Sequence, residues 1–212
     1  MTKTRISLAA EHAAREYEMF KKEAGILLRI ESNPFILRLI GLCAVPTFYA
    51  LVTEFVSGGD LSSLLKSDEH RAAVDKWETR VKFAKQIARG MLHLHSNQPS
   101  VIHHDLKAQN VLVACTQYND GVHFTCKVSD FGLSKMPGVS SVTTVRPDGS
   151  NPLGTVTHIA PERYREHPYG EDDDGGRMMD LAKKSDVYSY GVVLWEIREK
   201  ERPYKGFLSV SH

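Results

Sequence analysis

The stretch VIHHDLKAQNVLV, residues 101–113, places two histidines, an aspartate, a lysine and an asparagine between two apolar runs. Such a stretch is either a polar surface turn or a loop that carries out phosphoryl transfer. Transfer to a hydroxyl needs a carboxylate near that hydroxyl, positive charge near the phosphoryl group and ligands for a metal ion. Asp105, Lys107 and Asn110 supply one of each within six positions. The remainder of the chain has to separate the two interpretations.

The composition is that of an ordinary globular protein. Of the 212 residues, 42% are hydrophobic and 25% are charged, and the formal net charge is +1. This balance gives no reason to expect nucleic acid as a partner, and no apolar run is long enough for a membrane span. The three cysteines are far apart and odd in number, which favours reduced thiols. We therefore expect a cytoplasmic protein.

Hydrophobic periodicity and breaker residues divide the chain into helices and strands. The pattern predicts helices at 8–31, 61–66, 74–97 and 183–200, and strands at 35–45, 48–56, 110–115 and 123–131. Asp60 is a candidate N-cap for the second helix. The predicted apolar face of helix 74–97 consists of Val74, Trp77, Val81, Ala84, Ile87, Ala88, Met91 and Leu92. A long loop is predicted at 133–158.

Strands dominate the first part of the chain and helices the remainder. This order predicts an α+β fold with two lobes. The small β-rich N-lobe would comprise residues 1–56 and the mostly helical C-lobe residues 57–212, with residues 54–59 at the junction.

Three further motifs follow the polar stretch. SDFGLSK contains Asp130, whose carboxylate suits Mg²⁺; GTVTHIAPER contains Ala160-Pro161-Glu162; and SDVYSYGVVLWEI comes last. Four motifs in this order make coincidence improbable. Together they resemble the catalytic domain of the eukaryotic protein kinases. The tyrosine-kinase-like group is the most similar, and HHDLKAQN with IARGMLHLH looks most like the receptor-interacting serine/threonine kinases. The resemblance covers residues 1–212 as a partial kinase domain that we expect to be truncated at both ends.

The resemblance implies a role for each matched residue of the catalytic motifs. Asp105 would be the catalytic base that accepts the proton of the substrate hydroxyl, and Lys107 would steady the γ-phosphate of ATP. Asn110 and Asp130 would be the Mg²⁺ ligands. Thr155 would connect the substrate-binding loop to the base. Two further matches are structural: Asp186 would hold the catalytic loop from below, and Leu27, Leu39, His103 and Phe131 would form an apolar stack between the lobes.

A second set of residues would bind the nucleotide. The resemblance assigns to it Lys3, Glu23, Thr53, Glu54, Val56 and Leu112. Glu23 would pair with the ATP-binding lysine, for which Lys3 is the candidate, although Met1 replaces the alanine of that motif. Thr53 would be the gatekeeper residue, and the backbone of residues 54–56 would bind adenine. The Gly-rich loop of the family has no counterpart in the chain.

His104 departs from the family, which usually has arginine at this position. That arginine meets a phosphorylated activation loop, and a neutral imidazole cannot bind phosphate in the same bidentate way. We therefore expect catalysis not to depend on this contact.

The sequence thus predicts a serine/threonine protein kinase that uses ATP and Mg²⁺ to phosphorylate protein substrates in intracellular signalling. The form DLKAQN favours this specificity over tyrosine. A catalytically weak or inactive pseudokinase that acts as a scaffold, and an incomplete fragment, are the alternatives. A dimer of kinase domains is an additional expectation about partners.

Overall fold

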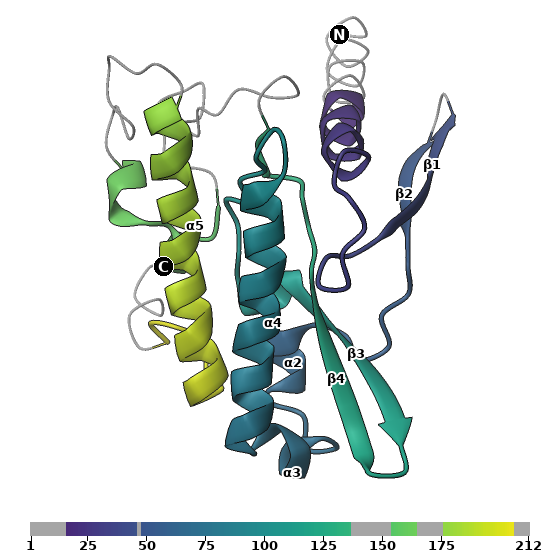
Figure 1. Ribbon diagram of the computed structural model, residues 1–212, viewed down its shortest axis with the longest axis vertical. Helices are drawn as coiled ribbons and strands as arrows, with labels where there is room; N and C mark the ends of the chain where they lie inside the picture. Colours follow the sequence, from purple (N-terminus) through teal and green to yellow (C-terminus); the bar gives the residue numbers. More distant parts are fainter. Residues whose placement is uncertain (1–15, 46–47, 137–153, 165–175, 206–212) are drawn as a thin grey trace, which may run out of the picture.

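The computed structural model describes residues 16–45, 48–136, 154–164 and 176–205 (Figure 1). It has the predicted α+β architecture, with a small antiparallel hairpin beside a region built around two long helices. The predicted loop at 133–158 is described at its two ends only. None of the helices in the described part of the chain is both long and apolar enough to cross a membrane.

The first part of the described chain contains a helix and a hairpin. Residues 16–27 are helical, and strands β1 (Leu39–Val45) and β2 (Phe48–Thr53) pair in antiparallel fashion. The predicted helix end at 31 and strand start at 35 are therefore wrong by several residues. The reason is a tertiary contact, because Leu37 N–H donates to Val128 O (2.9 Å) and Val128 N–H donates to Phe35 O (2.8 Å). This segment binds a strand of the other lobe instead of extending the hairpin.

The described residues after β2 contain four α-helices and a second hairpin, together with three short 3₁₀ helices. The longer elements are α2 (Leu61–Leu64), α3 (Arg71–Val74), α4 (Trp77–Ser96), β3 (Val111–Tyr118), β4 (Gly121–Val128) and α5 (Gly176–Glu199). The 3₁₀ helices are η1 (Ala108–Asn110), η2 (Val156–His158) and η3 (Pro161–Tyr164). The predicted cap is confirmed, since Asp60 Oδ1 accepts from Ser63 N–H at 2.9 Å. The predicted start of the last helix at 183 is too late, and the predicted helix 74–97 is divided because Val74 ends a separate short helix. The predicted second strand extends only to Thr53, so that residues 54–56 form a linker.

Helices α4 and α5 lie antiparallel to one another and form the centre of this part (Figure 1). The Arg80 guanidinium at the start of α4 donates to Arg198 O at the end of α5 (3.1 Å). Near the middle of both helices, the Tyr190 hydroxyl donates to Ala84 O (3.0 Å). The same two helices carry or flank the polar motifs, so their packing determines where those motifs meet.

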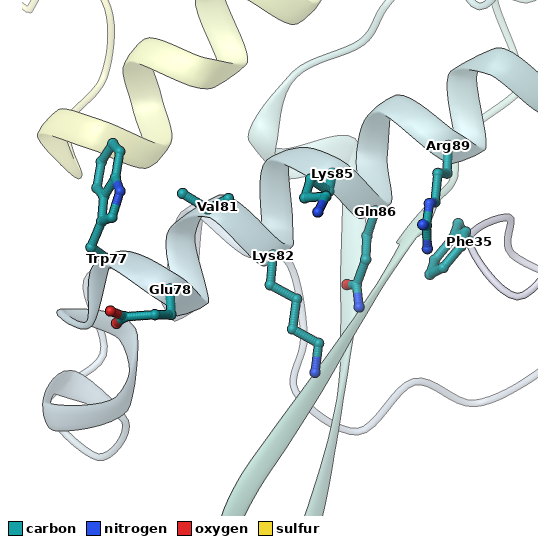
Figure 2. Close-up of a pocket in the computed structure, with 8 residues that line it drawn as sticks. All are labelled: Phe35, Trp77, Glu78, Val81, Lys82, Lys85, Gln86 and Arg89. Carbon is teal, nitrogen blue, oxygen red and sulfur yellow. The ribbon is translucent and has the colours of Figure 1, made fainter.

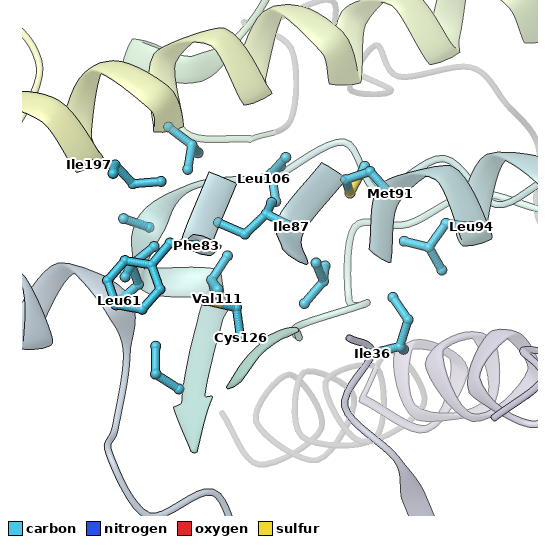
Figure 3. Packing of buried hydrophobic residues seen from close by; sticks show 14 of the residues in the cluster. Ile36, Leu61, Phe83, Ile87, Met91, Leu94, Leu106, Val111, Cys126 and Ile197 are labelled. Carbon is cyan, nitrogen blue, oxygen red and sulfur yellow. The ribbon is translucent and has the colours of Figure 1, made fainter. Parts of the chain in front are cut away.

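The opposite side of α4 packs on the β3–β4 hairpin and makes the main core (Figure 3). The buried positions of α4 are Phe83, Gln86, Ile87, Gly90, Met91 and Leu94. The Phe83 ring meets Phe124 edge-on, with centroids 5.6 Å apart. Gly90 is required for close packing, because a Cβ at this position would lie 2.8 Å from Phe35 O.

The predicted apolar face of α4 is partly wrong. Ile87 and Met91 are buried as expected, but Trp77 and Leu92 are 65% and 66% exposed. Trp77 and Val81 instead line a shallow surface pocket of about 450 Å³ together with three basic side chains of α4 (Figure 2). The buried stripe is shifted by about one residue, or 100° around the helix, because the side that contains Gly90 allows the closest approach.

Candidate functional site

The polar loop of residues 101–110, here called the catalytic loop, is held at its start by a carboxylate of α5. The backbone N–H groups of His103 and His104 donate to Asp186 Oδ2 and Oδ1 at 2.8 and 2.9 Å. Asp186 is 1% exposed and also lies 2.9 Å from His95 Nε2. Burial acts to raise the pKa of Asp186, but the hydrogen bond with His95 and the other nearby imidazoles together lower it below its ordinary value. The carboxylate is therefore ionised, and both of its oxygens hold the loop.

Asp105, the predicted base, has both carboxylate oxygens engaged. Thr155 donates to Oδ1 from its backbone N–H (2.8 Å) and its hydroxyl (2.7 Å). The ammonium group of Lys107 lies 3.0 Å from Oδ2 and 2.8 Å from the Thr155 hydroxyl oxygen. Burial acts to raise the pKa of Asp105, whereas the bonds from Thr155 and Lys107 outweigh this effect and lower the pKa. The structure thus brings a fixed carboxylate and a cation together beside Thr155.

The predicted metal ligands Asn110 and Asp130 lie near each other because Ser129, the residue before Asp130, is hydrogen-bonded to Asn110. Asn110 Nδ2 donates to Asp105 O (2.8 Å) and to Asp105 Oδ2 (3.0 Å), and its amide oxygen accepts no hydrogen bond within the described residues. Ser129 N–H and Oγ both donate to Asn110 O at 2.9 Å, which places Asp130 next to Asn110 in space. Asp130 is exposed, with φ at 63°.

Asn110 and Asp130 supply only part of the oxygen ligands that Mg²⁺ needs, so substrate phosphates and water would have to complete the set. The described residues contain no group of three or more His, Cys, Asp or Glu side chains suited to a metal ion. One amide oxygen and one carboxylate are the kind of partial oxygen set that holds Mg²⁺ together with substrate phosphates and water.

The two histidines of the motif have different surroundings. His103 is fully buried, its Nε2 lies 3.0 Å from Ser129 O, and its ring centroid is 5.4 Å from that of Phe131. His104 is 2% exposed, and neither ring nitrogen has a hydrogen-bond partner among the described residues. Burial lowers the pKa of His104 to about 3, so the ring is neutral near pH 7. The Arg163 guanidinium donates to the backbone oxygen of His104 at 3.1 Å.

Glu23 lies at the edge of the site, facing the segment that follows Asp130. Burial and the nearby Asp130 raise the pKa of Glu23, and it forms no ion pair in the described part of the chain. Its neighbour Lys22 donates to Gly132 O at 3.4 Å. Lys3, the predicted partner of Glu23, lies outside the described residues.

The predicted nucleotide-binding segment connects β2 to α2 and runs beside β3, where Gly58 N–H donates to Val113 O at 2.8 Å. The Glu54 carboxylate is engaged within the protein: its Oε1 lies 2.9 Å from Lys127 Nζ and accepts from Arg38 N–H. Val56 is buried, and its backbone N–H and C=O make no hydrogen bond within the described residues. Leu112 forms a β-bridge with Asp60, so it lies just beyond this segment. Thr53 ends β2 opposite Leu39 and is half-buried.

Two buried residues of the site were not expected from the sequence. Glu196 on α5 is 2% exposed, and its Oε2 accepts from Ala108 N–H in the catalytic loop at 3.0 Å. His158 Nε2 lies 3.0 Å from the same oxygen. The only local signal was a charged residue within the apolar run VVLWEI.

A two-lobed fold that holds an aspartate, a lysine and an asparagine in one loop, followed by an exposed aspartate, defines the catalytic-domain architecture of a protein kinase. The chain matches the family "Protein tyrosine and serine/threonine kinase" over residues 3–211, and it belongs to this family.

Individual relatives agree with this assignment. The chain is 32% identical over 185 residues to receptor-interacting serine/threonine-protein kinase 2 of Bos taurus, covering 87% of this chain and 31% of the relative. In Arabidopsis thaliana, serine/threonine-protein kinase CTR1 is 34% identical, covering 91% of this chain and 20% of the relative. Serine/threonine/tyrosine-protein kinase HT1 of the same plant is 35% identical, with 94% and 44% covered. The chain thus spans less than half the length of these relatives, and the predicted likeness to receptor-interacting kinases is confirmed.

Proposed function

We propose that this chain transfers the γ-phosphoryl group of ATP to serine or threonine hydroxyls of proteins. In this proposal residues 1–56 act as the N-lobe and residues 57–212 as the C-lobe. The observation that carries the proposal is the network in which Thr155, Lys107 and Asn110 all contact the Asp105 carboxylate. A role in cytoplasmic signalling is part of the proposal; the names of the relatives support the serine/threonine kinase activity itself.

Each residue of this network has a chemical task in the proposed reaction. Asp105 orients the attacking hydroxyl and accepts its proton, and the hydrogen bonds from Thr155 set the direction of the carboxylate. Lys107 lies 3.0 Å from Asp105 and supplies positive charge near the transferred group. Asn110 and Asp130 would hold Mg²⁺, which when bound neutralises charge on the phosphates. The backbone N–H and C=O of Val56, which make no hydrogen bond within the described residues, would bind the adenine ring.

The substitution Asp105→Asn tests the proposal. It removes the base but keeps the size of the side chain and an acceptor for the two Thr155 bonds, although its amide nitrogen cannot accept from Lys107 or Asn110. We therefore expect kcat to fall by about 10²- to 10⁴-fold while ATP binding is retained. The matched control is Asp120→Asn, in the exposed turn between β3 and β4. Phosphotransfer to a protein substrate is measured with ³²P-ATP, and nucleotide binding by calorimetry. Unchanged turnover of the Asp105 variant would contradict the assigned role.

The alternative of an inactive scaffold predicts a different result in the same experiment. The wild-type chain would then bind ATP with Mg²⁺ but transfer no phosphoryl group to any substrate.

A further inference from the structure

The catalytic loop is attached to α5 at its end as well as at its start. Asp186 accepts the N–H groups of His103 and His104, and Glu196 accepts the N–H of Ala108 at 3.0 Å. Ala108 directly follows Lys107 and stands two positions before Asn110. One rigid helix therefore holds both ends of the segment that carries the reacting groups.

The Glu196 carboxylate is itself held in one orientation. His158 Nε2 lies 3.0 Å from Glu196 Oε2, and the two side chains are 4% and 3% exposed. The other ring nitrogen of His158 lies 2.9 Å from the Thr157 hydroxyl, and His158 O accepts from Ser189 Oγ on α5 at 2.7 Å. His158 is thus attached to α5 and fixes the orientation of the Glu196 carboxylate.

The stability of the folded protein does not by itself explain why residue 196 is a glutamate. A buried carboxylate is costly unless it is well paired, and Glu196 forms no ion pair with Lys or Arg among the described residues. Its contacts are one backbone amide and one imidazole. An apolar residue would continue the run that includes Trp195 and Ile197. What the carboxylate adds is a defined position for Ala108.

We propose that Glu196 is a positioning residue for phosphoryl transfer, acting through the Ala108 amide, and that His158 orients its carboxylate. The inference rests on the proposed kinase activity. Small displacements of reacting groups lower reaction rates strongly. Fixing Ala108 would keep Lys107 and Asn110 in their positions relative to Asp105. Glu196 also lines a surface pocket of about 460 Å³ with Lys107 and Arg202, which makes direct contact with a substrate the competing explanation.

The test compares Glu196→Ala, Glu196→Gln and the control Glu199→Ala in the full 212-residue chain. Glu199 is an exposed carboxylate on the same helix whose ion pair is with its neighbour Arg198. The glutamine variant keeps an acceptor for Ala108 N–H and remains informative where the alanine variant does not fold. All three variants are compared with the wild type in two measurements.

The first measurement is hydrogen exchange of the Ala108 amide, which needs no activity. We expect exchange to accelerate about tenfold to a hundredfold in Glu196→Ala, to recover in part in Glu196→Gln and to stay unchanged in Glu199→Ala. The same exchange rate in Glu196→Ala as in the wild type would overturn the inference.

The second measurement is steady-state kinetics. We expect kcat to fall about tenfold to a hundredfold in Glu196→Ala with little change in KM for ATP or peptide, and part of the loss to be recovered in Glu196→Gln. A raised KM for peptide with unchanged kcat would overturn the inference in favour of substrate contact. An equal loss in Glu199→Ala would overturn it in favour of general destabilisation. If the wild type transfers no phosphoryl group, the proposed function fails, while amide exchange still decides whether Glu196 holds the loop.

Discussion

Burial of the His104 ring makes the stability of this protein depend on pH. The ring is 2% exposed, neither nitrogen is hydrogen-bonded within the part of the chain that the structure describes, and burial lowers its pKa from 6.5 to about 3. In the unfolded chain the same imidazole accepts a proton near pH 6.5. Between these two values the unfolded state binds one more proton than the folded state, so folding stability falls as pH falls from 6.5 towards 3.

The size of the effect follows from the two pKa values. Each pH unit inside this window changes the free energy of unfolding by about 1.36 kcal/mol. pH 5 lies about 1.5 pH units below the unfolded pKa of 6.5. The free energy of unfolding at pH 5 is therefore about 2 kcal/mol lower than that of a chain with no titrating group at this position. That is a large part of the stability of a typical domain.

The perturbation is His104→Asn, measured by urea unfolding at pH 7 and pH 5. Asparagine does not titrate in this range and tolerates the positive φ of 65° at this position. We expect the wild type to lose about 2 kcal/mol more than the variant between the two pH values. His104→Gln, which is also non-titrating, should behave like the asparagine variant. An identical pH dependence of wild type and both variants would refute the argument from burial.

Three further predictions concern packing and charge. Phe83→Ala, in the core of α4, should lower the free energy of unfolding by about 3–5 kcal/mol, whereas Trp77→Ala, 65% exposed, should change it by less than about 0.5 kcal/mol; equal effects in urea unfolding would contradict the observed burial. Gly58→Ala would press a methyl group against the backbone of β3 and should destabilise by about 1–3 kcal/mol, while Gly41→Ala has open space around it and serves as the control in thermal unfolding. The Lys22 amine, whose pKa is lowered to about 8 by burial and by a nearby lysine, should show a midpoint near pH 8 in acetylation kinetics; a midpoint above about 10 would be inconsistent with its burial.

Local chemistry explains why several features could be predicted from the sequence. The cap at Asp60 depends on residues three positions away, and the β3–β4 turn depends on the short polar stretch between two apolar runs. The order of the motifs from Asp105 to Asp186 was enough to indicate the family, because the same residue types recur at similar spacing.

The buried face of α4 could not be predicted from its own sequence. The helix carries two overlapping apolar stripes, and the predicted apolar face combines residues from both. The choice between them depends on the backbone of Phe35, which approaches Gly90 so closely that no other residue fits. That contact joins segments 55 positions apart and does not exist until the chain is folded.

The amino-acid sequence by itself determined the class of this protein and the residues of its polar loop, because those depend on side-chain chemistry and short spacings. Only the tertiary structure decided how that loop is held. Glu196 meets Ala108 across 88 positions and His158 across 38, and both contacts arise from the packing of α5 against the catalytic loop. A buried carboxylate in an apolar run has no hydrogen-bond partner in its own segment. Its role therefore depends on which distant residues the fold places within hydrogen-bond distance of it.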